Sequence, residues 1–287
     1  MKMQMDHLVN KLINDLPSIK DKHVRSSEAY SDFSKELRYE IEKIFNDPSE
    51  EKKSFGPFGE IVFPYFRMGN KSSLDLFDLD EMIIFSFYWA NRNRYKRVLD
   101  IGANIGLHSL ILSKCGYIVN SFEPDPVHFG QLCRVLKINE ANQVNPHQGA
   151  VSATPGEAEF VRVLGNTTSS HLAGCKQPYG DLERFAVKLY GIRDIIREVD
   201  LIKMDVEGHE DKILLATMGN DWKAMDAIVE IGGSEKAALI FNHFKNENVN
   251  LFAQKIGWEK VTELAYMPMS YKEGSLFITK KSQMPWG

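Results

Sequence analysis

The chain of 287 residues has few cysteines, no long hydrophobic run and no marked excess of charge of either sign. Its three cysteines, Cys115, Cys133 and Cys175, are an odd number and lack the spacing of metal ligands. A disulfide framework or a zinc site is therefore not expected. The most apolar window, residues 82–90, falls well short of the roughly 20 residues that a transmembrane helix needs. We expect no membrane span.

The overall charge is also modest. A net charge of −4 at pH 7 favours neither nucleic acid nor an anionic membrane as a partner. Residues 1–17 contain no uninterrupted apolar core of the kind found in a signal peptide. Together with the cysteine content, this predicts a protein of the reducing cytoplasm. The hydrophobic content of 43% is enough for a globular core.

Residues 1–54 are predicted to form a helical extension. Apolar positions recur at helical spacing over residues 8–16 and again over 30–45, and Pro17 ends the first run. The polar, proline-broken residues 46–53 that follow are typical of a linker. Three roles are open for this extension: packing on the main domain, covering the functional site, or association between copies of the chain.

Residues 55–287 are predicted to form one α/β domain, because short apolar runs alternate with segments of helical periodicity. An aromatic-rich helix over 75–94 is expected to pack on a sheet, and 150–182 is expected to be less regular, with short strands such as 158–163. Strands are expected at 97–101, 117–122, 143–149, 200–204, 227–231, 258–264 and 275–280, and helices at 106–115, 126–141, 210–218 and 234–245. This order predicts a Rossmann-like, doubly wound, mostly parallel sheet, which binds ligands at the carboxyl ends of its strands.

The most informative stretch lies at the first of these strands. Residues 98–106 read Val-Leu-Asp-Ile-Gly-Ala-Asn-Ile-Gly, which is an apolar strand, an acid and a turn with two glycines. A helical pattern follows, so this is the opening of a nucleotide-binding βαβ unit. Glu123 closes the next apolar run, 17 residues after Gly106. An acid at that place can accept hydrogen bonds from both hydroxyls of a ribose.

The charge around this turn indicates which nucleotide binds there. A dinucleotide fingerprint needs glycine where this chain has Asn104 and Leu107. Clustered carboxylates would repel a pyrophosphate but suit a cation. Such carboxylates are expected around the turn from Asp100, Glu123, Asp125, Asp205 and Glu207. The pattern favours S-adenosylmethionine, which carries a sulfonium and an ammonium and no phosphate, over NAD.

Residues 205–210 (Asp-Val-Glu-Gly-His-Glu), directly after the strand at 200–204, are the strongest candidate for chemistry. Methyl transfer to oxygen needs close alignment and a group that takes the proton of the acceptor. The candidate catalytic residues are Asp205, Glu207 and His209, and a histidine at a helix start can accept a proton near neutral pH. Helix capping and binding of the ammonium of the donor are open alternatives for the two acids.

Three further interpretations concern neighbouring residues. Asp205, Glu207 and Glu230 have the oxygen ligands that a magnesium ion prefers, although a metal-free site is favoured. His108, just inside the helix, would either approach the methionine part of the donor or simply pack. The polar stretch 165–174 is a candidate acceptor-binding loop or an ordinary surface loop.

Three motifs in this order resemble the FkbM family of S-adenosylmethionine-dependent methyltransferases, and the resemblance covers roughly residues 97–265. The motifs are Asp100–Gly106, Phe122–Pro126 and Ile202–Glu210, together with the acid Glu230. The resemblance implies a class I methyltransferase fold and O-methylation of a hydroxyl on a sugar, polyketide or other small metabolite. By position it also implies the donor-binding residues, which are Asp100, Gly102, Asn104 and Gly106 in the loop, Glu123 at the ribose, and Asp125, Ala150 and Val151 at the adenine edge.

Two other functions stay open. One is an NAD-linked oxidoreductase that modifies sugars, against which Leu107 in place of a glycine argues. The other is a non-catalytic binding subunit that keeps the methyltransferase fold and binds a partner through the N-terminal helices.

Overall fold

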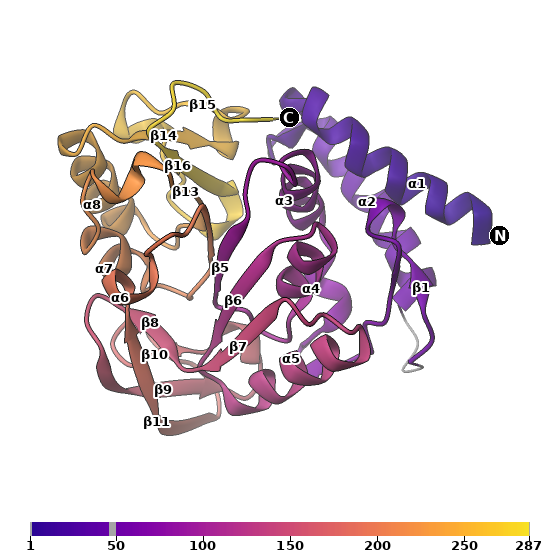
Figure 1. Ribbon diagram of the computed structural model, residues 1–287, viewed down its shortest axis with the longest axis horizontal. Helices are drawn as coiled ribbons and strands as arrows, with labels where there is room; N and C mark the ends of the chain where they lie inside the picture. The colour runs from indigo at the N-terminus through magenta and orange to yellow at the C-terminus, as the bar shows by residue number, and fades with distance from the viewer. Residues whose placement is uncertain (1, 46–49, 287) are drawn as a thin grey trace.

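A central sheet with helices on both faces organises the computed structural model, which describes residues 2–45 and 50–286 (Figure 1). The strand order across this sheet is β15-β14-β16-β13-β12-β5-β6-β7. Its strands are β5 (Arg97–Ile101), β6 (Ile118–Glu123), β7 (Val144–Gln148), β12 (Leu201–Met204), β13 (Asp226–Glu230), β14 (Asn250–Ala253), β15 (Glu259–Lys260) and β16 (Ser275–Thr279).

The connections of this sheet reverse direction between β5 and β12. The chain runs outward from β5 through β6 to β7, and it then returns to β12 on the other side of β5. The five strands from β13 to β7 are parallel, whereas β16 is antiparallel to both β13 and β14. A reversal of this kind opens a ligand crevice at the carboxyl ends of the two central strands. The predicted doubly wound, mostly parallel α/β sheet is confirmed.

Helices cover the two faces of the sheet in chain order. The helices on one face are α3 (Leu79–Ala90), α4 (Leu107–Lys114) and α5 (Pro126–Ile138), and those on the other are α6 (Ile192–Ile195), α7 (Glu210–Leu215) and α8 (Ser234–Asn246) (Figure 1). Neighbouring residues of β5 pack on opposite faces of the sheet. Val98 belongs to the apolar cluster that contains residues of α3 and α4, and Leu99 belongs to the cluster that contains residues of α7 and α8. A parallel sheet covered in this way needs apolar residues on both faces of its strands.

Helix α3 lies in the core, as its aromatic content predicts. Phe85, Phe87 and Tyr88 are fully buried. The helix begins at Leu79 rather than near residue 75, because a 3-10 turn over Ser73–Leu76 comes first. The side chain of Asp78 caps α3 by accepting a hydrogen bond from the backbone N–H of Glu81 (3.0 Å).

The stretch 150–182, which we expected to be less regular with short strands such as 158–163, contributes to a second sheet, and that predicted strand lies within β9. The strand order in that sheet is β10-β9-β11-β8. Its strands are β8 (Ala150–Ser152), β9 (Gly156–Val163), β10 (His171–Leu172) and β11 (Leu182–Gly191). The sequence pattern did not predict β11, since Glu183, Arg184 and Lys188 interrupt its apolar alternation. Short strands also pair near the N-terminus, and these are β1 (Lys53–Ser54) with β2 (Glu60–Ile61) and β3 (Arg67–Met68) with β4 (Lys71–Ser72).

The N-terminal extension forms the expected helices, α1 (Lys2–Asp15) and α2 (Glu28–Phe45). Ile13 of α1 and Ile41 of α2 are fully buried, and they belong to the same apolar cluster as Phe85 of α3. Of the predicted linker 46–53, residues 46–49 lie outside the described residues. A division of the chain at residue 54 and association of copies through these helices stay predictions.

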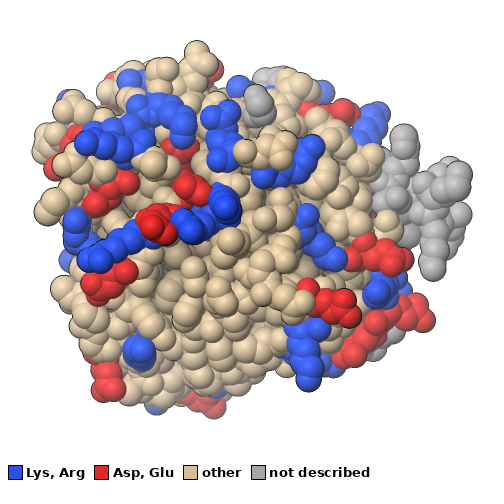
Figure 2. All heavy atoms as spheres, in the orientation of Figure 1, with Lys and Arg blue, Asp and Glu red and all other residues tan. Residues whose placement is uncertain are grey.

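The surface visible in Figure 2 carries charges of both signs. Lys and Arg side chains lie next to Asp and Glu side chains, with uncharged surface between them. Over residues 2–45 and 50–286, no helix combines the length and the apolar character that crossing a bilayer requires.

Replacing Ile41 tests whether the extension is part of the main core. We expect Ile41→Ala to lower the free energy of unfolding by about 2–5 kcal/mol, because a fully buried side chain is truncated inside the shared cluster. Glu36→Ala, on the exposed face of the same helix, should change it by about 0.5 kcal/mol or less. Urea denaturation followed by circular dichroism measures both. An Ile41→Ala protein whose main transition is unchanged would show that the extension folds separately.

Candidate functional site

The loop after β5 meets the loop after β12 at the carboxyl edge of the sheet. Gly102 has a left-handed φ of +82°, and a Cβ atom placed on it would lie 1.7 Å from the carbonyl oxygen of Asp205. Glycine alone permits both this conformation and this approach. Asn104 (φ +52°) and Gly106 (φ +94°) complete the turn before α4 begins. The predicted glycine-rich turn thus brings two of the sequence motifs into contact.

Glu123 stands at the end of β6 and faces this turn. Its Oε2 accepts a hydrogen bond from the backbone N–H of Asn104, and its Oε1 accepts one from that of Asp125, both at 2.8 Å. Burial raises the pKa of the carboxyl to about 8, although these two hydrogen bonds act in the opposite direction. Each oxygen can still interact with a hydroxyl group of a ligand, which fits the predicted contact with a ribose.

Asp125 caps helix α5 and is also held by an arginine. Its Oδ1 accepts a hydrogen bond from the backbone N–H of Val127 (2.8 Å), and the guanidinium of Arg162 on β9 donates to both carboxylate oxygens at 2.6 Å. Burial opposes ionisation of Asp125, but the hydrogen bonds from Arg162 outweigh it and hold the pKa below its usual range. The carboxylate therefore fixes the second sheet to α5, and its contact with the adenine stays a prediction.

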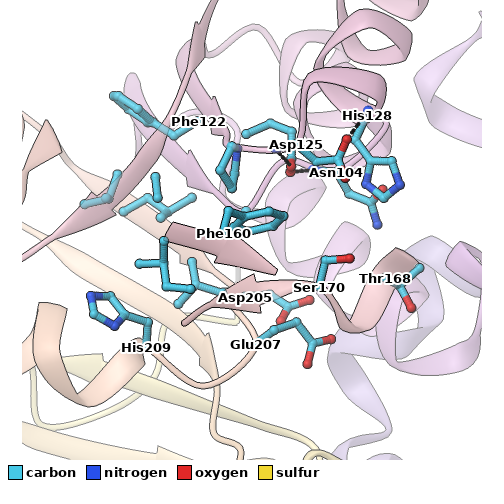
Figure 3. Close-up of a pocket in the computed structure, with 18 of the residues that line it drawn as sticks. Asn104, Phe122, Asp125, His128, Phe160, Thr168, Ser170, Asp205, Glu207 and His209 are labelled. Carbon is cyan, nitrogen blue, oxygen red and sulfur yellow. Dashed lines mark hydrogen bonds between the residues drawn. The ribbon is translucent and has the colours of Figure 1, made fainter. Parts of the chain in front are cut away.

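The segment after β12 makes a strained turn. Glu207 has a φ of +54° and Gly208 one of +103°. A left-handed conformation is uncommon for a residue as large as glutamate, and such strain is concentrated at functional sites. The Oε1 of Glu210 accepts a hydrogen bond from the backbone N–H of Gly208 (2.9 Å) and so fixes the turn. The carboxylates of Asp205 and Glu207 then face the pocket (Figure 3).

The carboxylate of Glu207 is paired with the ammonium of Lys176. Burial, followed by the neighbouring charge of Asp205, raises the pKa of Glu207 to about 7, whereas Lys176 acts to lower it. A carboxyl group that titrates near neutral pH is well matched to accept a proton there.

His209 also lines the pocket, but both of its ring nitrogens have partners. Its Nε2 lies 2.9 Å from the Oγ of Ser152, and its Nδ1 lies 3.3 Å from the Sγ of Cys175. Burial lowers the pKa of the imidazole, so the ring is neutral near pH 7. These contacts connect β8 and the segment after β10 to the turn at Gly208. A direct part of His209 in proton transfer stays a prediction.

These side chains line a pocket at the carboxyl edge of the sheet (Figure 3). Most of the residues that the sequence nominated are in its lining. They are Gly102, Asn104, Glu123, Asp125, Ala150, Val151, Asp205, Glu207 and His209.

Asp100, Gly106 and His108 lie beside the pocket and are not among its lining residues. Asp100 accepts a hydrogen bond from the Oγ of Ser109 (2.6 Å) and lies 3.7 Å from the Nζ of Lys203. Gly106 ends the turn, and His108 bonds to side chains of α3. In this structure the three residues support the loop, and a direct contact with a ligand stays a prediction.

The second sheet supplies a wall of the pocket that the three motifs do not indicate. Its lining residues are Phe160, Thr167, Thr168, Ser170 and Leu172. The Nε2 of His128 lies 2.9 Å from the Oγ1 of Thr167, which connects this wall to α5. The polar stretch 165–174 had the composition of a binding loop, and its position is consistent with that interpretation. Nothing in the sequence indicates that Phe160 and His128 would line the pocket.

The carboxylates at this edge are not arranged as a metal site. In the two described ranges, no three or more His, Cys, Asp or Glu side chains are grouped so that they could hold a metal ion. The alternative in which Asp205, Glu207 and Glu230 bind magnesium therefore gains no support from their placement.

Comparison with known proteins gives two kinds of similarity in sequence. A model of the methyltransferase FkbM domain matches residues 100–258, which include all three motifs. The methyltransferase sdnD of Sordaria araneosa is 26% identical over 166 residues. That alignment covers 46% of this chain and 64% of the relative, so the chain spans less than two thirds of the length of the relative.

Two methyltransferases are among the solved structures with a partly similar course of the chain. The precorrin-6y C5,15-methyltransferase from Geobacter metallireducens GS-15 is 13% identical with a TM-score of 0.39, over 67% of this chain and 85% of that one. A SAM-dependent methyltransferase from Agrobacterium tumefaciens is 11% identical with a TM-score of 0.38, over 70% of this chain and 62% of that one.

Replacing Gly102 tests the close approach of the two loops. We expect Gly102→Ala to lower the free energy of unfolding by about 2–5 kcal/mol, since the new methyl group adds a clash with a carbonyl to an unfavourable φ. Gly116→Ala is the matched control, because Gly116 has a φ of +88° with nothing within 4 Å of a Cβ. It should cost only about 1–2 kcal/mol. Equal losses in urea denaturation would mean that the loops are free to separate.

Proposed function

The chain belongs to the FkbM methyltransferase family, and on that premise we propose that it transfers a methyl group from S-adenosylmethionine to a hydroxyl group of a sugar or another small hydroxylated metabolite. The lining of the pocket is the main support for this proposal. Among the described residues that line the pocket, four are acidic and none is Lys or Arg, because Arg162 and Lys176, the partners of Asp125 and Glu207, are not lining residues. A lining without Lys or Arg offers a pyrophosphate no cation to bind, which favours a donor without phosphate over a dinucleotide.

The residues present fit this cofactor. Glu123 offers a carboxyl group at the ribose position, held by two backbone N–H groups. Phe122, Val151 and Phe160 provide apolar surface in the same pocket, against which an adenine ring can pack. When bound, S-adenosylmethionine supplies an electrophilic methyl group on its sulfonium. The carboxylates of Asp205 and Glu207 favour a cation near them.

Glu207 is the residue that we assign to the proton of the acceptor. Its strained turn directs the carboxylate into the pocket, and its pKa of about 7 suits proton transfer near neutral pH. When the hydroxyl oxygen of an acceptor took up that methyl group, Glu207 would accept the proton of the hydroxyl. Lys176 holds the carboxylate in place, and His209 orients the segment that follows.

A polar acceptor is favoured by the wall opposite the two carboxylates. Thr168 and Ser170 lie on the side of the pocket toward which Asp205 and Glu207 point, while His209 lies on the other side in this view (Figure 3). Hydroxyl side chains can both donate and accept hydrogen bonds, as recognition of a sugar or a related metabolite requires. We therefore prefer a polyhydroxylated acceptor.

Donor binding can be tested with S-adenosylhomocysteine, the product of the donor. Isothermal titration calorimetry should detect binding to the wild-type protein and an affinity about 10- to 100-fold lower for Glu123→Gln, because hydrogen bonds to the ribose are lost. Glu157→Gln, an exposed change on β9, is the control and should bind like the wild type. Absence of binding to the wild type would overturn the proposed function.

The pH profile of methyl transfer tests the assignment of Glu207. The carboxyl must be ionised to accept a proton, so the rate should rise with pH up to the pKa of about 7 and level off above it. Glu207→Gln should remove this rise and lower kcat by about 100- to 10,000-fold. The exposed Glu235→Gln is the control. A Glu207→Gln enzyme with the profile of the wild type would contradict the assignment.

A further inference from the structure

A buried chain of hydrogen bonds connects helix α3 to the start of α4. The phenol oxygen of Tyr88 lies 3.0 Å from the Nδ1 of His108, and the Nε2 of His108 lies 2.6 Å from the Oε2 of Glu81. His108 stands in the first turn of α4, two residues after Gly106 ends the glycine-rich turn. The chain of hydrogen bonds therefore ends beside the loop that we assign to the donor.

Glu81 lies at the edge of the sheet where ligands bind. Helix α3 ends at Ala90 and leads to the start of β5 at Arg97, so its beginning lies toward the carboxyl ends of the strands. The side chain of His108 is 9% exposed, whereas that of Glu81 is 25% exposed. Oε2 of the carboxyl group is thus held by His108, while the side chain of Glu81 as a whole keeps some exposure to solvent.

The hydrogen-bond donors in this chain can be assigned from the protonation states. Burial keeps Tyr88 in its phenol form by raising its pKa, and burial lowers the pKa of His108 to about 3, so its ring is neutral. The buried phenol has Nδ1 of His108 as its partner, so it donates to that nitrogen. The remaining proton is then on Nε2, which donates to Oε2 of Glu81. No described residue donates a hydrogen bond to Oε1 of Glu81.

The surroundings of Glu81 are charged. Burial raises the pKa of its carboxyl to about 8; Lys203 on β12 acts to lower it, and Asp205, Asp80 and Asp100 act to raise it further. The charge of Lys203 is itself matched by Asp100 at 3.7 Å, and its Nζ donates to the carbonyl of Gly102 (3.3 Å). A cation placed at Oε1 would offset the burial of Glu81 and favour its ionised form.

We propose that Glu81 binds the ammonium group of the amino-acid arm of the donor, with His108 and Tyr88 as positioning residues. Glu123, which we assign to the ribose, contacts Asn104 in the glycine-rich turn, and Glu81 contacts His108 in the first turn of the helix that follows it. Glu81 precedes residues 100–258, which match the family model. Helix α3 thus adds a donor contact from outside the matched domain. The proposal rests on the proposed function, since it takes S-adenosylmethionine as the ligand.

Two ligands that differ in this arm test the proposal. S-adenosylhomocysteine has the amino-acid arm, and 5′-methylthioadenosine lacks it. By isothermal titration calorimetry, Glu81→Gln should bind S-adenosylhomocysteine about 10- to 100-fold more weakly than the wild type, because a charge-assisted hydrogen bond is lost. Its affinity for 5′-methylthioadenosine should stay within about twofold. His108→Asn should show a smaller loss with the same selectivity, and the exposed Glu36→Gln should show none.

The possible outcomes separate this inference from the proposed function. A wild-type protein that binds neither ligand overturns the proposed function itself. A Glu81→Gln protein that binds S-adenosylhomocysteine like the wild type overturns the role of Glu81 and leaves the proposed function standing. Equal losses for both ligands also overturn that role, because Glu81 would then support the shape of the pocket rather than contact the ammonium.

Discussion

The close approach of Gly102 to the carbonyl of Asp205 is the constraint on which the site depends. A Cβ on Gly102 would lie 1.7 Å from that oxygen, so the loops after β5 and β12 touch through their backbones. Backbone hydrogen bonds reinforce the contact, since the N–H of Asp205 donates to Ile101 and that of Gly102 donates to Phe122, each at 3.0 Å. The ends of three parallel strands thus form one rigid edge.

The acids along this edge differ because their partners differ. Backbone N–H groups hold Glu123, Arg162 neutralises Asp125, and Lys176 pairs with Glu207. In the lining of the pocket, burial raises the pKa of Glu123 and of Glu207, whereas Arg162 keeps that of Asp125 low. Acidic residues with such different environments can bind a ligand, support the fold and take a proton within one pocket.

Local sequence pattern predicted the parts of the fold that depend on neighbouring residues. The strand at 97–101 has the predicted bounds, and the helix predicted at 234–245 extends one residue further. The glycine-rich turn was equally clear, because Gly102 and Gly106 need a backbone that other residues adopt poorly. The strand expected at 158–163 lies within β9, but its sheet was not predicted, because charged residues on β11 obscure the alternation there.

Residue roles that depend on distant partners could not be predicted. His209 was predicted as a candidate base, but nothing near it in the sequence indicates that Ser152 and Cys175 would lie against its two ring nitrogens. Asp125 was predicted to contact the ligand, but its ion pair with Arg162 on β9 could not be predicted from the residues around it. In the same way, nothing in the sequence near Glu81 indicates that His108 would lie against it.

A crystal structure of the protein with S-adenosylhomocysteine tests the central claim most directly. We predict that the ligand occupies the pocket between the glycine-rich turn and residues 205–209, with its ribose hydroxyls about 2.6–3.2 Å from the carboxyl oxygens of Glu123. Electron density for the ligand elsewhere on the protein, or a ribose that does not contact Glu123, would contradict the claim.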